Sequence, residues 1–581
     1  MIGLRSRTRF NLPLGLLALL LGHAFRTSAL ALSTPAPTEA PAYSITGTVV
    51  SARDGAPIPN CHLTATLRSA GAPPRPVMQR RQVSDDSPAA NSDSGGHFRL
   101  SLPSAGMWQI AASGRGFRPQ NYEHHDNFFS SVALSASTPT YDLIFTLEPD
   151  SAITGSVLDE AGEGIRNARV TLFSAEPASP DLVSGAGLLR SATVTDDRGR
   201  YEFDGLAPGE YNIAVQAEPW YAAGLLGRRS SAAGASQVDP SLDVVYPQSW
   251  FPGVGDRHLA ETIILHDGEV RQASFNLTPV PATHLVITVP SQPPTGFQRG
   301  QSFPTVERVS ADGAPFLNTS IKFDPQGQVD IGGLSSGLYR VTVQRPDGPQ
   351  SPAFIRVSGG ALHNLDLSAA ISPATLTLHL IADGDTERVQ TILTDPSTGV
   401  RFSSSAQGTL QRRRNAVPNA ARGGDRKLDV PPGEYQVSLA GDPDLYLESI
   451  SINHSPVRSR MITVASGATT LDLKLTRGRA SIQGTARVED KPCIGAMVML
   501  VPETFGQTGS ITVLRRDQTN TDGSFSIESV IPGNYILVAI DKGWGVNWRD
   551  PLTLQRYLLH GVPVSLQSSG SVKQDLIAQK P

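Results

Sequence analysis

Histidine and glutamate recur in this chain at a spacing used by zinc peptidases. His258 with Glu261, and His266 with Glu269, each fit H-x-x-E. A catalytic zinc also needs a third ligand, an open coordination position and a general base. Both strings lie around a β segment, with no helix to hold them. We interpret both as chance matches.

Three further patterns resemble sites but lack the required scaffold. The segment Gly333–Gly337 fits G-x-S-x-G, but a nucleophile elbow must join a strand to a helix, and here the string occupies a predicted hairpin turn. His124, His125 and Asp126 are adjacent, so in extended backbone their side chains point apart, and a polar loop is favoured over adventitious metal binding. The acidic segment Asp383–Glu387 lacks the long oxygen-ligand loop of a calcium site. We therefore predict no catalytic residue, no cofactor and no metal.

Aromatic side chains are the remaining candidates for a binding site. An exposed aromatic ring offers an apolar face with polar edges, which suits a sugar ring. The candidates fall in two stretches and are Trp220, Tyr221, Trp250 and Phe251 in the first and Trp544 and Trp548 in the second. The alternative is that these rings cap the ends of domains or fill contacts between domains.

A repeated unit with two glycines and one aromatic residue must position these side chains. The second glycine follows the first by ten residues, and the aromatic residue follows two positions later: Gly96, Gly106 and Trp108; Gly199, Gly209 and Tyr211; Gly327, Gly337 and Tyr339; Gly523, Gly533 and Tyr535. A weaker copy has Gly423, Gly433 and Tyr435. Alternating apolar residues between such turns predict an antiparallel hairpin with one buried face. The tyrosine is expected to fold back onto a turn carbonyl, as in a tyrosine corner, or to serve as a core aromatic.

Repetition at intervals of about one hundred residues predicts a tandem array of domains. The expected fold is all-β, with about five small antiparallel β-sandwich domains of about seven strands each and no amphipathic helix. The predicted boundaries are 43–150, 151–281, 282–372, 373–477 and 478–581, which we number domains one to five. A glycine in the opening strand of three domains (Gly47, Gly155 and Gly484) predicts a bulge or a close backbone approach.

The N-terminal sequence has the pattern of an export signal. Arg5, Arg7 and Arg9 precede an apolar core at residues 12–21, and Ala29-Leu30-Ala31 fits a cleavage site, so residues 1–31 are predicted to be a signal peptide cut after Ala31. The alternative, an uncleaved anchor, is disfavoured because the core is shorter than the ~20 residues of a spanning helix. Residues 32–42 form a Pro-rich linker, and no later stretch is long enough to span a membrane.

The charge of the chain indicates which class of partner is disfavoured, and its cysteine content indicates the state of the thiols. Residues 1–31 hold four of the 49 basic residues and no acid, so the mature chain would carry 45 basic and 53 acidic residues, a net charge of about −8. No basic stripe is present, which disfavours a nucleic-acid partner. The two cysteines, Cys61 and Cys493, are predicted to be buried free thiols on the second strand of their domains.

Two long segments resemble the carboxypeptidase regulatory-like domain. They are "ITGSVLDEAGEGIRNARVTLF" with "TDDRGRYEFDGLAPGEYNIAV" in domain two, and "ASIQGTARVEDKPCIGAMVML" with "TDGSFSIESVIPGNYILVAI" in domain five. Domain one is similar, whereas domains three and four keep the spacing and lose the opening glycine. The resemblance implies a transthyretin-like (prealbumin/Ig-like) seven-stranded sandwich of the carbohydrate-binding-like group. It also implies an accessory rather than a catalytic part.

The sequence therefore predicts a secreted, periplasmic or cell-surface protein that is not an enzyme. We expect it to bind carbohydrate or a cell-surface polymer through loops, with the sandwiches as spacers. One alternative is a structural or adhesive module with envelope-protein partners. Another is an accessory to an outer-membrane transporter or a secreted hydrolase. A cryptic hydrolase has the least support.

Overall fold

The computed structural model describes residues 43–68, 87–125, 127–174, 188–222, 239–288, 305–310, 320–323, 328–342, 344–345, 348–349, 352–358, 364–365, 371–382, 386, 389–404, 426–442, 444–506 and 512–581. The predicted signal peptide, its cleavage site and the linker lie outside the described residues. So do Asp126 and the three acidic residues of the segment Asp383–Glu387.

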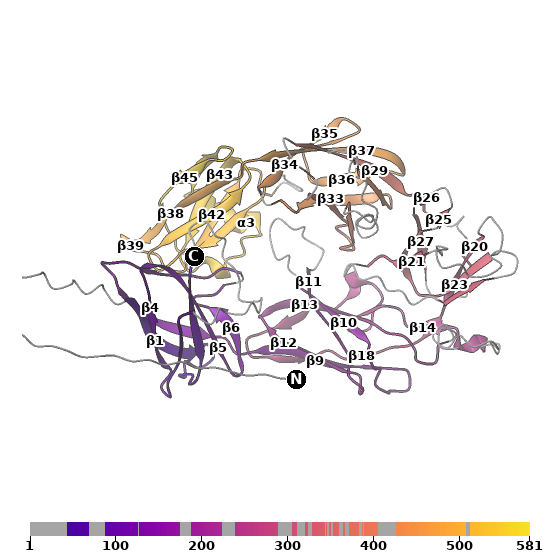
Figure 1. The fold of residues 1–581 in the computed structure, drawn as a ribbon, viewed down its shortest axis with the longest axis horizontal. Coiled ribbons are helices and arrows are strands. Elements are labelled where there is room, and N and C mark those ends of the chain that lie inside the picture. Colours follow the sequence, from indigo (N-terminus) through magenta and orange to yellow (C-terminus); the bar gives the residue numbers. More distant parts are fainter. Residues whose placement is uncertain are drawn as a thin grey trace, which may run out of the picture. The chain divides into compact units, whose positions relative to one another are not determined.

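Almost all of the regular secondary structure of the described chain is β-strand (Figure 1), which confirms the all-β prediction. Each predicted domain range contains two main sheets. In domain one, a sheet of β1 (Tyr43–Ser51), β4 (His97–Leu102) and β8 (Thr140–Leu147) faces a sheet of β2 (His62–Leu67), β3 (Ala89–Asn91), β5 (Gly106–Gly114), β6 (Phe117–Asn121) and β7 (Val132–Leu134).

Domain two carries additional short elements. One sheet holds β9 (Ser151–Leu158), β12 (Arg200–Leu206), β17 (Val270–Gln272) and β18 (Phe275–Asn276), and the other holds β10 (Arg169–Ser174), β11 (Leu188–Val194), β13 (Gly209–Gln216), β15 (Ser249–Trp250) and β16 (Ile263–Leu265). A ribbon of β14 (Val244–Val245) and β19 (Val280–Pro281) and the 3-10 turns η1 (Pro240–Leu242) and η2 (Arg257–Leu259) complete it.

Domains three and four repeat the two-sheet plan. Domain three has β20 (Thr283–Thr288), β22 (Ser320–Phe323), β23 (Gln328–Leu334) and β28 (Asn364–Leu365) opposite β21 (Thr305–Arg308), β24 (Gly337–Thr342) and β27 (Ala353–Val357), with a ribbon of β25 (Gln344–Arg345) and β26 (Gly348–Pro349). Domain four has β29 (Ala374–Ala382), β32 (Arg426–Val430), β34 (Leu445–Ile452), β35 (Ser455–Val457) and β37 (Gly467–Arg477) opposite β30 (Gln390–Thr394), β31 (Arg401–Ser403), β33 (Gly433–Ala440) and β36 (Met461–Val464).

Domain five contains an α-helix, which corrects the prediction that no domain has an amphipathic helix. Its sheets are β38 (Ala480–Val488), β39 (Lys491–Pro492), β42 (Ser524–Val530), β45 (Ser571–Lys573) and β46 (Leu576–Ile577), and β40 (Met497–Pro502), β41 (Arg515–Gln518), β43 (Gly533–Ile540) and β44 (Val562–Leu566), with the 3-10 turn η4 (Gly543–Gly545) and helix α3 (Pro551–Leu558). The Asp550 carboxylate caps α3 by accepting hydrogen bonds from the amides of Leu552 and Thr553, each at 3.1 Å. Leu554 and Tyr557 bury one face of this helix.

The opening strand is central in every domain. It pairs antiparallel with the strand that follows the first glycine turn, and parallel with the closing strands: β1 with β4 and β8, β9 with β12, β17 and β18, β20 with β23 and β28, β29 with β32 and β37, and β38 with β42, β45 and β46. The sequence predicts antiparallel sheets, so these parallel pairs differ from the prediction. The parallel pairing arises because the chain passes through the opposite sheet before it returns beside its first strand.

The predicted hairpin is wrong, because its two strands lie in opposite sheets. In domain five, β42 pairs with β38 and β43 pairs with β40. The turn at Gly533 therefore arches across the domain and does not join paired strands. A period-two pattern could not distinguish the two cases, since each buries one face of each strand.

The predicted fold-back is confirmed for the four tyrosines, and Trp108 makes the equivalent bond in domain one. The ring hydroxyl, or the indole N–H of Trp108, donates a hydrogen bond to the carbonyl four residues earlier: Trp108 to Ser104 at 3.1 Å, Tyr211 to Ala207 at 2.8 Å, Tyr339 to Ser335 at 2.9 Å, Tyr435 to Pro431 at 2.6 Å and Tyr535 to Ile531 at 2.5 Å. This bond ties the arch to the start of the next strand.

The opening glycines lie where another backbone approaches closely, as predicted. A Cβ at Gly47, Gly155 or Gly484 would come within 2.0, 1.9 or 1.8 Å of a carbonyl oxygen of the closing segment. Only glycine leaves room for that approach. Domain four has no such glycine, and its β29–β37 ladder runs without interruption from Ala374 to Ala382.

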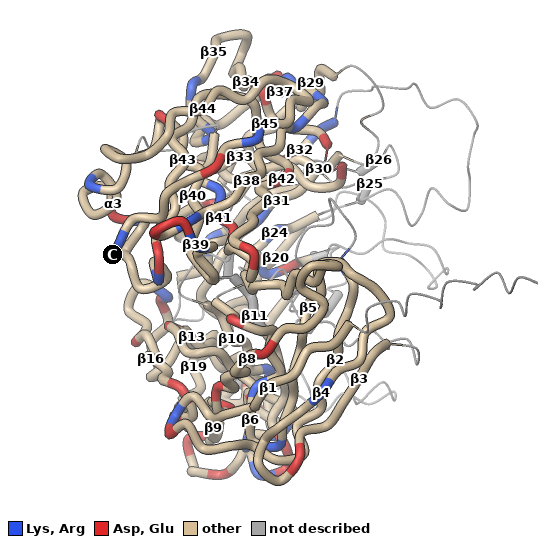
Figure 2. The backbone as a smooth tube through the Cα atoms, turned by 90° about the vertical axis from the view of Figure 1, so that its left-hand side faces the viewer, with Lys and Arg blue, Asp and Glu red and all other residues tan. Residues whose placement is uncertain are grey.

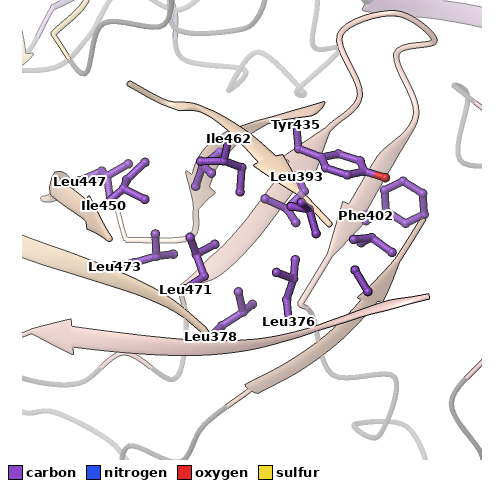
Figure 3. Close-up of a cluster of buried hydrophobic side chains, with 14 of the residues drawn as sticks. Leu376, Leu378, Leu393, Phe402, Tyr435, Leu447, Ile450, Ile462, Leu471 and Leu473 are labelled. Carbon is purple, nitrogen blue, oxygen red and sulfur yellow. The ribbon is translucent and has the colours of Figure 1, made fainter. Parts of the chain in front are cut away.

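Each domain has an apolar core between its sheets, and the core of domain four also takes in Phe354 of β27. Figure 3 shows the core of domain four, where Leu376 and Leu378 of β29 and Leu471 and Leu473 of β37 face Tyr435 from the opposite sheet. Cys61 and Cys493 are buried and free, as predicted. They lie just outside strands, before β2 and after β39, and not within them.

Acidic and basic residues are interspersed along the described backbone (Figure 2). Among the described residues, no helix is long and apolar enough to cross a membrane.

Candidate ligand-binding site

A tight turn in domain two presents two aromatic rings together. It follows β13, and the Ala222 amide donates to the Pro219 carbonyl at 3.0 Å, which leaves Trp220 and Tyr221 at the two corner positions. The ring centroids of Trp220 and Tyr221 are 5.6 Å apart, with the planes at 89°. Trp220 is 72% exposed, so a face of its indole is open to solvent.

A carboxylate from another connection joins this turn. Glu160 lies in the turn after β9, where the Asp159 carboxylate accepts hydrogen bonds from the amides of Ala161 at 2.9 Å and Glu163 at 2.8 Å. That Asx turn holds Glu160 outward, and its carboxylate accepts hydrogen bonds from the Tyr221 hydroxyl and, at 2.8 Å, from the Tyr246 hydroxyl. We call Glu160, Trp220, Tyr221 and Tyr246 the Trp220 site.

Titration in the Trp220 site follows from these hydrogen bonds. Burial opposes ionisation of Glu160, but the hydrogen bonds from the Tyr221 hydroxyl, the backbone and the Tyr246 hydroxyl together outweigh it and lower the pKa of this carboxyl. Burial and the neighbouring carboxylate raise the pKa of Tyr221 to about 12, and the same causes raise the pKa of Tyr246. At neutral pH the site therefore contains one carboxylate and two neutral tyrosine hydroxyls.

This arrangement offers the acceptors and the apolar face that suit a polyol. An ionised carboxylate has about four acceptor positions, and the two tyrosines use two of them. The remaining positions can accept hydrogen bonds from sugar hydroxyls, while the open indole face of Trp220 can stack on an apolar sugar face.

Trp250 and Phe251, which the sequence grouped with Trp220, pack against the two faces of one sheet. Trp250 is 6% exposed and covers the outer face, with its ring centroid 5.1 Å from that of Phe173 and the Arg257 guanidinium 5.6 Å from its centroid. Phe251 packs into the inner core against Phe275 at 6.0 Å. Neither ring joins the Trp220 site.

Trp544 and Trp548 are also engaged in packing. Trp548 is 8% exposed and lies in the apolar cluster that covers the outer face of β40 and β43. The Arg516 guanidinium lies 4.3 Å from its ring centroid and 5.5 Å from that of Trp544. Trp544 also stacks on His125 of domain one, at 5.1 Å and 7°. The two tryptophans therefore share a cationic neighbour, and Trp544 lies at a domain contact.

The sequence analysis missed Glu160 as a member of the site. It lies 61 residues before Tyr221, in a polar turn that carries no aromatic signal. Tyr246 belongs to the aromatic stretch of domain two, but nothing in the sequence indicated that it shares a carboxylate with Tyr221.

Residues of the two H-x-x-E strings and of the G-x-S-x-G string serve local structure. The Glu269 carboxylate accepts a hydrogen bond from the His266 amide at 3.0 Å, and His258 lies in η2, where its amide donates to Asp256 at 2.9 Å. The Ser335 amide donates to the Tyr339 hydroxyl at 3.1 Å within the arch. Among the residues that the structure describes, no group of three or more His, Cys, Asp or Glu side chains could hold a metal ion.

Comparisons with solved structures give matches of low similarity. The Bacillus anthracis TIE protein is 10% identical and aligns over 94% of this chain and 76% of its own, with a TM-score of 0.16. A streptococcal ancillary pilin is 11% identical over 56% of this chain and 98% of its own, with a TM-score of 0.18. The minor pilin GBS52 of Streptococcus agalactiae is 11% identical over 43% of this chain and 99% of its own, with a TM-score of 0.20. TM-scores this low carry no argument about function.

The comparison with curated proteins gave no match. A family model does match part of domain two, over residues 152–231, and that span contains Glu160, Trp220 and Tyr221. This span contains the opening strand β9, the turn glycines Gly199 and Gly209, and the corner residue Tyr211. Residues 152–231 of domain two therefore match the carboxypeptidase regulatory-like domain, as the resemblance in the sequence indicated.

Proposed function

We propose that this protein is a secreted, non-enzymatic chain of β-sandwiches that binds carbohydrate or a sugar-containing cell-surface polymer through the Trp220 site. The observation that carries the proposal is the exposed Trp220 ring, held edge to face on Tyr221 and beside the hydrogen-bonded carboxylate of Glu160. The other sandwiches act as spacers.

The cost of exposure supports a binding role. A fully exposed tryptophan forgoes the hydrophobic stabilisation that burial of so large a side chain would supply. Its orientation is nevertheless constrained by the turn hydrogen bond between Ala222 and Pro219 and by the Tyr221 ring. A pre-oriented ring loses little conformational entropy when a ligand stacks on it.

Affinity electrophoresis of the mature chain, residues 32–581, tests the proposal. Gels cast with different plant and bacterial polysaccharides should retard the wild-type chain in one or a few cases. Trp220→Ala should abolish the retardation in those gels, and Glu160→Gln should reduce it, because Gln keeps one acceptor but loses the charge.

Leu259→Ala is the matched control. Leu259 is 70% exposed in the same domain, but it lies in η2 and has no place in the Trp220 site. This variant should be retarded like the wild type. Uniform mobility of the wild-type chain in every gel would contradict carbohydrate binding and favour the structural or adhesive alternative, with envelope proteins as partners. Equal retardation of wild type and Trp220→Ala would place the binding elsewhere.

A further inference from the structure

The side chains of the Trp220 site offer a ligand mainly hydrogen-bond acceptors. The Tyr221 hydroxyl donates to Oε1 of Glu160, and the Tyr246 hydroxyl donates to Oε2 at 2.8 Å. Each hydroxyl has one proton, so both protons are used, and an ionised carboxylate has none. The carboxylate has about four acceptor positions, and each tyrosine oxygen also has lone pairs. The other side-chain donor of the site is the indole N–H at the edge of Trp220. A ligand rich in donors therefore fits the site best.

The Trp220 site is also negatively charged. Although burial opposes it, hydrogen bonds from the two tyrosine hydroxyls and the backbone keep the pKa of Glu160 below its ordinary value. Burial raises the pKa of Tyr221 to about 12, and the charges of Glu160 and Asp159 add to that rise. The charge of Asp159 therefore reaches the site together with that of Glu160. Two negative charges repel an anionic sugar and attract a cationic one.

Tyr221 connects this charge to the exposed indole ring. Its own ring packs against Trp220 with the centroids 5.6 Å apart and the planes at 89°, and its hydroxyl donates to Glu160. Trp220 is 72% exposed, so its indole face is open to a ligand. An indole face attracts a cation as well as an apolar sugar face, because the negative part of its quadrupole lies over the ring. A ligand that contacts both Trp220 and Glu160 thus meets two groups that favour positive charge.

Three common sugar substituents differ in how well they match these groups. A hydroxyl supplies one donor and no charge. An acetamide supplies one N–H donor, but its carbonyl needs a donor from the protein, and the side chains of the site are mainly acceptors. A protonated amine supplies three donors, no acceptor and a positive charge, so it can donate to the carboxylate and to a tyrosine oxygen together. Its hydrogen bond to the carboxylate is charge-assisted, and such bonds are roughly twice as strong as neutral ones.

We propose that the Trp220 site selects carbohydrate that carries a protonated amino group, with the sugar ring on Trp220 and the ammonium group on Glu160. This inference rests on the proposed carbohydrate binding and specifies the ligand of the same site, an amino sugar whose nitrogen is not acetylated. Trp220 and Glu160 contact the ligand, whereas Tyr221 and Tyr246 hold the carboxylate in place. Polymers of uronic acids or sugar phosphates are disfavoured by the same charges.

Three short oligosaccharides test the selection. They share a β-1,4-linked glucose backbone and differ only at C2, where they carry a hydroxyl, an acetamide or an amine. Isothermal titration calorimetry at about pH 5.5 measures their binding to the mature chain, with Glu160 ionised and the amine protonated. The amino oligosaccharide should bind about tenfold more tightly than either of the others.

Two variants assign this preference to residues. Glu160→Gln removes the charge and keeps a hydrogen-bond acceptor, so the preference for the amine should disappear while weaker binding of all three oligosaccharides remains. Trp220→Ala should weaken the binding of all three, since it removes the face on which the sugar ring stacks. Glu434→Gln is the matched control, because it removes the same charge from an exposed position on β33 of domain four. This control should keep the wild-type preference.

The remaining outcomes overturn the selection and are distinguishable from one another. Equal binding of the three oligosaccharides that is lost in Trp220→Ala would contradict selection of the amine and leave the proposed carbohydrate site in place. A preference for the amine that Glu160→Gln and Glu434→Gln change equally would mean that the acidic chain attracts cations without a specific site. Failure of all three oligosaccharides to bind the wild type would also overturn the selection, and the polysaccharide gels would then decide the proposed function on their own.

Discussion

Domains two and five carry the same addition at the same place. In each, the segment after the corner strand, β13 or β43, folds back and covers the outer face of its sheet with a tryptophan, Trp250 or Trp548. The inner strands β10 and β40 are then buried along almost their whole length, whereas β2 of domain one alternates between buried and exposed residues. A covered outer face thus explains the unbroken apolar run in β40.

The two additions differ in the aromatic residues that they leave uncovered. In domain five, Trp544 and Trp548 both contact Arg516, and Trp544 packs on domain one. In domain two, Trp220 stays exposed with Tyr221 and Glu160 beside it. Aromatic content alone therefore does not separate packing from binding. What separates them is whether the ring lies over the outer face of the sheet or on a turn beyond its edge.

Truncation of Trp548 should have the largest effect on stability. Trp548→Ala removes a ring that covers β40 and β43, so we expect the free energy of unfolding of domain five to fall by about 3 kcal/mol. Urea denaturation followed by circular dichroism measures this loss. A change below about 0.5 kcal/mol, the range of ordinary surface substitutions, would show that the cluster is not part of the domain's packing.

Two carboxylates, Asp517 of β41 and Glu160 of the Trp220 site, should change stability with pH in opposite directions. Burial raises the pKa of Asp517, next to Arg516, to about 6, so its ionised form destabilises the fold as pH rises from about 4 to above 6. Asp517→Asn should therefore raise the free energy of unfolding by up to about 2 kcal/mol at pH 7 and leave it unchanged below pH 4. The control is Glu160→Gln. Because folding lowers the pKa of Glu160, its ionised form stabilises the fold only at pH values above the pKa of this group in the unfolded chain. At this exposed position the stabilisation is less than about 0.5 kcal/mol. A gain from Asp517→Asn that is equal at pH 4 and pH 7 would contradict the assignment.

Trp544→Ala should weaken the contact between domains one and five more than it destabilises domain five itself. The amides of Ser131 and Ala133 donate across that contact, so their hydrogen-exchange protection reports its opening. We expect about a tenfold loss of protection at both amides, equivalent to about 1.4 kcal/mol. The Ala112 and Ile110 amides of β5, inside domain one, serve as internal references. A uniform loss across β5 would instead indicate that domain one unfolds.

Trp220→Ala should change stability least. Its ring is largely in water, so the free energy of unfolding should stay within about 0.5 kcal/mol of the wild type while polysaccharide retention is lost. Thermal unfolding measured beside affinity electrophoresis separates the two effects. A loss above about 1 kcal/mol would mean that Trp220 is a packing residue like Trp548, and the comparison between the two domains would fail.

Several features were predictable from residue types alone. The spacing of Gly533 and Tyr535 predicted both the turn and the ring that folds back on it, because positive φ favours glycine and a tyrosine two residues later reaches the preceding carbonyl. The opening Gly484 predicted a close backbone approach for the same kind of reason. The alternation of apolar residues predicted strands and an all-β chain.

What only the tertiary structure decided depends on partners distant in the chain. Each strand buries the same side chains whether β42 and β43 pair or lie in opposite sheets. The local sequence pattern therefore cannot distinguish the two arrangements. Trp250 and Trp220 are equivalent in the sequence, and only the position of the neighbouring sheet makes one a cover and the other an exposed ring. Glu160 joins Tyr221 because two turns end at the same place in three dimensions. Local backbone conformation is determined by residue type, whereas burial and pairing are determined by which surfaces the folded chain brings together.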